Sequence, residues 1–149
     1  MANRSQPPET PDNGTRALEH RELVACFPGT FEEDPVRILR AVRFAAQLEF
    51  TLAPSVAPLI SRALPRLPRV SGERIRDELI AVFETDRAHE AIQILNALGG
   101  LDVVFPELSA GRGLDQGDFH HLDVLSHQLE TVAQADRFLA DFAEFSEPL

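Results

Sequence analysis

The feature that most constrains the fold is the spacing of apolar residues between positions 34 and 48. Asp34 followed by Pro35 is typical of a helix start, because aspartate caps helices and proline tolerates the first helical position. Beyond them, apolar residues recur with the period of a helix, and arginines gather on another side. We therefore predict a helix over 34–48 with a core face and a cationic face. The core face holds Ile38, Leu39, Val42, Ala45 and Ala46, and the cationic face holds Arg37, Arg40 and Arg43.

Helical periodicity continues along the rest of the chain. Prolines at 65 and 68 predict a break, and Gly99-Gly100 predicts a left-handed helix cap. No segment shows the strict alternation of a half-buried strand, so we predict an all-α, multi-helix protein with no sheet. The further predicted helices cover 15–25, 55–64, 72–83, 87–98 and 121–145.

Two of these helices have faces that the sequence predicts. In the helix over 72–83, we expect Ile75, Leu79, Val82 and Phe83 to point inward, and Arg74, Arg76, Asp77 and Glu78 to be more exposed. In the helix over 121–145, the expected apolar stripe is Leu122, Leu125, Leu129, Val132, Phe138, Leu139 and Phe142.

The domain organisation follows from local composition. Residues 1–14 are polar and rich in proline, which predicts a disordered or ragged N-terminus. Residues 15–109 form the predicted helical body. The Gly-rich, polar segment 110–118 predicts a linker, and 119–149 a terminal helical region.

Composition narrows the function classes. The single cysteine, Cys26, excludes an intrachain disulfide, and no apolar run approaches the ~18 residues of a membrane span. We therefore expect a reducing, cytoplasmic setting and no membrane partner. Although the net charge of the chain is −10, the segment 35–76 is basic, because it contains eight arginines and only two acidic residues. Such a local excess of positive charge favours an anionic ligand.

The residues at the start of the first predicted helix have chemistry of their own. Asp34 and Arg37 lie one helical turn apart, as an acceptor and a planar fork of donors. They can either pair with each other or together present hydrogen bonds to the flat edge of a ligand. The residues alone leave both alternatives open.

Three segments carry a resemblance to a known family. They are 33–50, with Glu33-Asp34-Pro35 followed by Arg37, then 70–79 and 99–108. Together they resemble the class II tRNA nucleotidyltransferase (CCA-adding enzyme) and bacterial poly(A) polymerase family over about residues 12 to 130. The resemblance implies the helical neck and body of that family, which bind tRNA or another RNA 3′ end.

The resemblance also implies roles for single residues. Asp34 and Arg37 match the family's EDxxR motif, which acts as an amino-acid template for the base of the incoming ATP or CTP. Glu33 is then expected to orient Arg37. Arg40 and Arg43 are expected to face the triphosphate or the RNA backbone, with solvated surface arginines as the alternative.

Arg74 and Arg76, with Glu73, are implied by the resemblance to build the part of the neck that receives the tRNA acceptor end. The alternative is structural ion pairing with Asp77 or Glu78.

The family's catalytic head is what this sequence does not contain. Neither its Gly-Gly-x-x-x-Arg turn nor its Asp-x-Asp pair, which holds two metal ions for phosphoryl transfer, occurs here. Mg²⁺ is expected only with that head. The chain is then expected either to work with a separately encoded head or to be a truncated copy.

A second cluster lies near the C-terminus. His120 or His121, Asp123 and His127 have side chains suited to a divalent metal, and the segment resembles the opening of an HD-type phosphohydrolase region. The adjacent His-Asp pair of that superfamily and its later Asp are missing, so a helix N-terminus with surface histidines is the alternative. The sequence therefore leaves two competing functions. One is a fragment of a metal-dependent HD phosphohydrolase, and the other is a helical interaction or remnant domain without activity.

Overall fold

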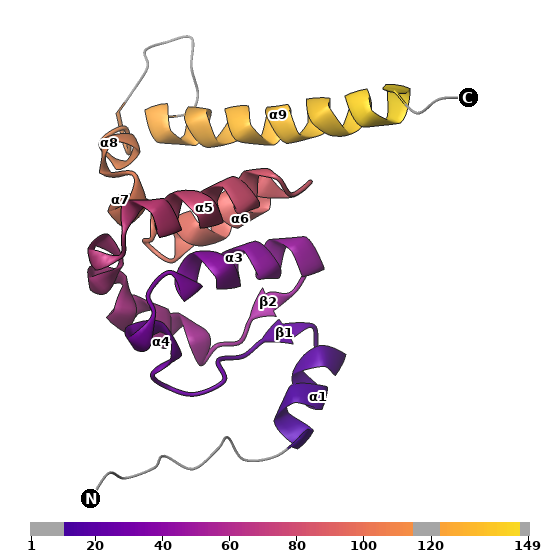
Figure 1. Ribbon diagram of the computed structural model, residues 1–149. Helices are drawn as coiled ribbons and strands as arrows, with labels where there is room; N and C mark the ends of the chain where they lie inside the picture. Colours follow the sequence, from indigo (N-terminus) through magenta and orange to yellow (C-terminus); the bar gives the residue numbers. More distant parts are fainter. Residues whose placement is uncertain (1–10, 115–122, 147–149) are drawn as a thin grey trace, which may run out of the picture.

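The computed structural model describes residues 11–114 and 123–146, with side chains from 14 to 114 and from 123 to 141. Within these residues the chain is helical apart from two very short strands, which confirms the all-α prediction (Figure 1). The helices are α1 (Pro11–Glu19), α2 (Thr30–Glu33), α3 (Arg37–Leu48), α4 (Val56–Ala63), the 3-10 helix η1 (Leu64–Arg69), α5 (Gly72–Phe83), α6 (Ala88–Ala97), α7 (Leu101–Val104), α8 (Pro106–Ser109) and α9 (Val124–Ser146).

Helix α3 is the central element. It packs against α5 and α6, and α6 in turn packs against α9, so that these helices form successive layers in Figure 1. The predicted core face of α3 is confirmed, because Ile38, Leu39, Val42, Ala45 and Ala46 are all buried. Burial of such apolar side chains contributes ~1.5–3 kcal/mol for each large one, which fixes α3 in the middle of the molecule.

The start of α3 differs from the prediction. The helix begins at Arg37 rather than Asp34, and Asp34 instead ends the short helix α2, which the sequence did not predict. The Arg37 N–H donates to the Asp34 carbonyl at 3.1 Å, and the Ile38 N–H donates to the Pro35 carbonyl at 3.0 Å. A tight turn closed by backbone carbonyls therefore joins the two helices, and it leaves the Asp34 carboxylate to other partners.

A two-stranded parallel sheet also departs from the prediction. Strands β1 (Glu22–Leu23) and β2 (Thr51–Leu52) pair over two residues each, where no sheet was expected. The helix predicted over 15–25 stops at Glu19, and α3 stops before Glu49, since Arg21 and Glu49 adopt left-handed conformations with φ of 52° and 55°. Such a conformation ends a helix, and the chain leaves it extended. Helix α1 also begins at Pro11, inside the segment predicted to be ragged.

The later helices confirm the predicted boundaries to within three residues at either end. Helix α4 tolerates Pro58 because that residue lies in the first turn, where backbone N–H groups have no helical partner. The proline-rich break is a 3-10 helix, and Gly99 has the expected positive φ of 75°.

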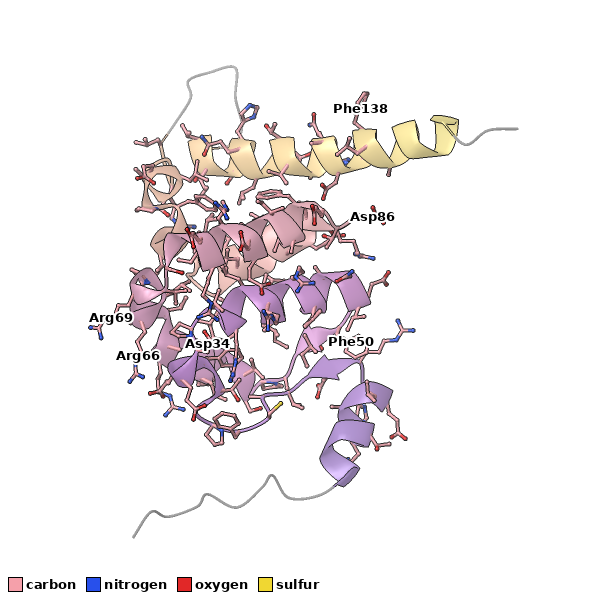
Figure 2. The ribbon with its side chains drawn as sticks, in the orientation of Figure 1. Asp34, Phe50, Arg66, Arg69, Asp86 and Phe138 are labelled. Atoms are coloured by element: carbon pink, nitrogen blue, oxygen red, sulfur yellow. The ribbon has the colours of Figure 1, made fainter. Side chains whose placement is uncertain are left out.

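The predicted faces of α5 and α9 are only partly correct. On α5, Val82 is buried as expected, but Phe83 is exposed and Glu78 is buried. On α9, Leu125 is buried, whereas Phe138 and Leu139 are exposed (Figure 2). Phe138 and Leu139 lie toward the end of α9, and Leu122 and Phe142 lie outside the residues whose side chains are described.

The segment that leads into α9 is tied to it by hydrogen bonds. The Leu125 N–H donates to the Gly111 carbonyl at 3.2 Å, and the Val124 N–H donates to the Leu114 carbonyl at 3.0 Å. Residues 115–118 of the predicted linker lie outside the described residues, so the domain boundary there stays a prediction. Across the described ranges, no helix combines the length and the apolar character needed to cross a membrane.

Candidate functional site

The Asp34 carboxylate lies at the junction of α2 and α3, where it meets two arginines (Figure 2). Its Oδ2 atom accepts a hydrogen bond from Arg74 Nη2 of α5 at 2.8 Å, and Arg37 Nε of α3 lies 3.7 Å from the same oxygen. The other oxygen, Oδ1, is buried and has no hydrogen-bond partner among the described residues. Three residues from three parts of the fold therefore form one charged group, which we call the Asp34 cluster.

The electrostatics of this cluster favour the ionised carboxylate. The hydrogen bond from Arg74 lowers the pKa of Asp34 from its usual value, burial opposes this, and the charges of Arg74 and Arg37 lower it further. Asp34 is consequently charged at neutral pH. The charged carboxylate is a hydrogen-bond acceptor whose Oδ2 bonds to Arg74 and whose Oδ1 is closed off from solvent.

Arg37 contacts both α2 and Asp34. Its Nη1 donates to the Thr30 carbonyl of α2 at 3.2 Å, so backbone and Asp34 together fix the guanidinium. Glu33, which was expected to orient Arg37, is exposed and forms no described contact with it. The role of Glu33 in orienting Arg37 stays a prediction.

Arg40 and Arg43 form a second group, which we call the Glu78 cluster. Arg40 donates to Glu78 Oε1 through Nε at 2.9 Å, and Arg43 Nη2 lies 3.4 Å from Oε2. The Arg43 guanidinium also lies 4.6 Å from the ring centre of Phe44. The prediction that Glu78 is exposed was wrong. Binding of triphosphate or RNA by these two arginines stays a prediction, and in this structure they join α3 to α5.

The two arginines of α5 have separate partners. Arg74 pairs with Asp34, a partner that was not considered, whereas Arg76 pairs with its neighbour Asp77 at 2.8 Å as one alternative expected. Glu73 is exposed on the first turn of α5.

The structure adds arginines to which the sequence assigned no role. Arg66 lies 3.1 Å from Glu32 of α2, and in Figure 2 both Arg66 and Arg69 point away from the body of the molecule. With Arg62 they form an exposed basic row on α4 and η1, close to α2. The local excess of arginine between 35 and 76 was the signal for this row.

A pocket of about 470 Å³ lies beside the Asp34 cluster, between α3 and the segment 23–31. Arg37 and Arg40 contribute to its wall, and the other lining residues are mostly apolar. They are Leu23, Val24, Ala25, Cys26, Phe27, Thr30, Phe31, Ala41, Phe44, Leu52 and Val56. The arginine donors of α3 thus border a space large enough for a flat organic ring.

In the described part of the C-terminal cluster, Asp123 caps helix α9. Asp123 Oδ1 accepts from the Ser126 N–H and Oδ2 from the Gly113 N–H, both at 2.7 Å, which is the geometry of a helix cap. The hydrogen bond to Ser126 lowers the pKa of Asp123. No group of three or more metal-binding side chains occurs among the described residues. His120 and His121 lie outside them, so the metal site stays a prediction.

Comparison with known proteins gives the class of this chain. A family model described as "Probable RNA and SrmB- binding site of polymerase A" matches residues 49–111. The A-adding tRNA nucleotidyltransferase of Deinococcus radiodurans is 40% identical over 83% of this chain and 30% of its own length. The CC-adding tRNA nucleotidyltransferase of Geobacter sulfurreducens is 32% identical over 93% of this chain and 30% of its own length.

A solved structure agrees. A tRNA nucleotidyltransferase complexed with a primer tRNA and an incoming ATP analogue matches 91% of this chain and 37% of its own length, with a TM-score of 0.67 and 28% identity. The helical layers and these matches define the class of the chain, a helical region of the nucleotidyltransferase type. The chain belongs to the class II tRNA nucleotidyltransferase family, as a region of the neck and body type. It spans about a third of the length of the curated relatives it matches.

Proposed function

We propose that this chain selects the base of the incoming nucleotide and binds the 3′ end of a tRNA or related RNA, for a nucleotidyltransferase that adds C and A residues. The observation that carries the proposal is the Asp34 cluster. It places a charged acceptor beside the donors of Arg37 at the junction of α2 and α3, and Arg37 also lines a pocket.

The hydrogen-bonding order of this pair matches two bases. Cytosine and adenine each present an exocyclic amine beside a ring nitrogen acceptor, so a carboxylate can accept from the amine while a guanidinium donates to the ring. Uracil and guanine present the opposite order. Each buried polar group left unmatched costs ~1–3 kcal/mol, so two mismatches reject the wrong base by a factor on the order of hundreds.

The basic row on α4 and η1 supports RNA binding by the same chain. Arg62 and Arg66 are about half exposed or more, and only Glu32 among the described carboxylates neutralises them. Guanidinium groups bind phosphates through paired donors, and each phosphate contact adds to the salt dependence of binding. Arg62 and Arg66 both lie near Glu32, which precedes Asp34 by two residues in the chain.

In this proposal catalysis takes place in the family's head domain. Phosphoryl transfer in such enzymes uses metal ions held by carboxylates. In this proposal ATP and CTP are the substrates, and Mg²⁺ enters with the head.

The test is nucleotide transfer to a tRNA that lacks its 3′ end, with this chain mixed with a family head domain. We expect no transfer by the chain alone, and transfer of CMP and AMP in preference to UMP and GMP when the head is present. Asp34→Ala and Arg37→Ala should each lose that preference by about tenfold or more. Glu130→Ala and Arg137→Ala, which alter an exposed pair on α9, are the matched controls. Transfer that stays selective without Asp34 and Arg37 would refute the base-selecting role.

A further inference from the structure

Asp34 is held by an arginine that is 40 residues away in sequence. Arg74 reaches it from α5 with the 2.8 Å bond to Oδ2, whereas Arg37, one turn along the chain, stays 3.7 Å from that oxygen. Asp34 therefore lies between two cations on different helices. The shorter of its two contacts is to Arg74, a residue to which the family resemblance gives no role in recognising the base.

This arrangement matters because Asp34 and Arg37 attract each other. Opposite charges three residues apart near a helix start form a direct ion pair when nothing competes. A closed pair of that kind uses the acceptor and the donors on each other, and neither remains for a ligand. Arg74 competes for the carboxylate from the side of α5, and the Thr30 carbonyl holds Arg37 from the other side.

We propose that Arg74 is a positioning residue, which keeps Asp34 and Arg37 apart and thereby sets the discrimination of cytosine and adenine against uracil and guanine. The inference rests on the proposed base-selecting function and extends it to α5. Arg74 is about half exposed, and its 2.8 Å hydrogen bond to Asp34 Oδ2 is the contact through which it acts.

The chemistry of Arg74 fits this role better than a lysine would. A guanidinium offers donors in a rigid plane, and one of them fixes the direction of the Asp34 carboxylate while others stay in solvent. An ammonium group on a flexible stem holds the carboxylate less firmly. Replacement by lysine is therefore expected to preserve the charge and to lose part of the positioning.

The experiment is an NMR titration of the full chain, labelled with ¹⁵N, with CTP and separately with UTP. We expect the wild-type chain to bind CTP more tightly. Arg74→Gln should reduce the ratio of the two dissociation constants by about tenfold, the worth of one hydrogen bond to a charged group. Arg74→Lys should keep part of the ratio. The matched control is Arg137→Gln on α9, whose partner is the exposed Glu130, and its ratio should equal that of the wild type.

The outcomes separate this inference from the proposed function. A wild-type chain that does not distinguish CTP from UTP refutes the base-selecting function, and the inference with it. A selective wild type with an equally selective Arg74→Gln refutes the inference alone, as does a uniform loss of affinity for both nucleotides at an unchanged ratio. If Arg74→Gln does not fold, an Arg74→Lys chain with the full wild-type ratio overturns the proposal.

Discussion

Two charged clusters connect α5 to other parts of the fold, one to α3 and the other to the junction of α2 and α3, and they differ in how completely their acids are satisfied. In the Glu78 cluster both carboxylate oxygens face arginines of α3, and only 11% of the Glu78 side chain is exposed. In the Asp34 cluster one oxygen serves Arg74, the other has no partner among the described residues, and 24% of the side chain is exposed. A saturated buried carboxylate contributes to holding a fold together, whereas an acid with unused capacity can bind something else.

The largest effect on stability is expected at Glu78. Glu78→Gln removes the charge that compensates Arg40 and Arg43, and Arg43 is itself mostly buried. Breaking a buried pair leaves an uncompensated charge, so we expect the free energy of unfolding to fall by about 2–3 kcal/mol. Urea denaturation followed by circular dichroism measures the loss.

The control for this change is Glu84→Gln, at the exposed end of the same helix, which should alter stability by less than about 0.5 kcal/mol. Equal effects of the two substitutions would show that the Glu78 cluster is not a structural connection. In that case Arg40 and Arg43 would be free to bind triphosphate or RNA as the family resemblance implies.

The smaller difference between the clusters can be measured as coupling energies. A double-mutant cycle on Arg40 and Glu78 should give about 1–2 kcal/mol, and one on Arg74 and Asp34 about 0.5–1 kcal/mol, because the second pair is more exposed to solvent. The fully exposed pair of Arg76 and Asp77 should give about zero. Coupling that is stronger at Asp34 than at Glu78 would reverse the assignment of structural and functional roles.

These clusters also show how far the sequence leads. The core of α3 was predictable, because its apolar residues repeat with helical spacing and burial enforces that pattern. Asp34 and Arg37 were found from their neighbourhood in sequence and the family resemblance. The sequence placed both at the start of the helix, although α3 begins three residues later than expected.

The sequence contained a sign that Glu78 is buried, but the charge of the residue suggested that it is exposed. Position 78 lies three residues after Ile75 and four before Val82, and so on the inward stripe of α5. The arginines of α3 supply the matching charges, but only the packing of α3 on α5 shows that they meet.

Other features had no local signal. The contact of Arg74 with Asp34 spans 40 residues, so only the fold can bring it about. The strands β1 and β2 contain two residues each, too few for alternation to be recognised. Likewise, the exposed Phe138 and Leu139 continue the helical stripe of α9 past the point where α6 covers it, and periodicity cannot tell where a partner helix ends.

The smallest expected effect is on the pH dependence of stability, since the hydrogen bond from Arg74 lowers the pKa of Asp34 in the folded state. A carboxyl group with a lowered folded pKa stabilises the fold above its unfolded pKa, about 3.9 for aspartate, and this contribution is lost as the pH falls through the folded value. The difference in unfolding free energy between the wild type and Asp34→Asn should therefore stay constant from neutral pH to about pH 5 and shrink below about pH 4.

The variant is needed for this measurement because Asp34 is not the only such group. Hydrogen bonds from Ser109 and Ser126 also lower the pKa values of Asp102 and Asp123, so the wild-type curve alone reports several carboxylates together. Asp123→Asn should show a shrinking difference of the same sign. A wild-type advantage over Asp34→Asn that grows in acid would mean that the carboxylate is not held ionised by Arg74. The Asp34 cluster would then lack the charged acceptor on which base selection depends.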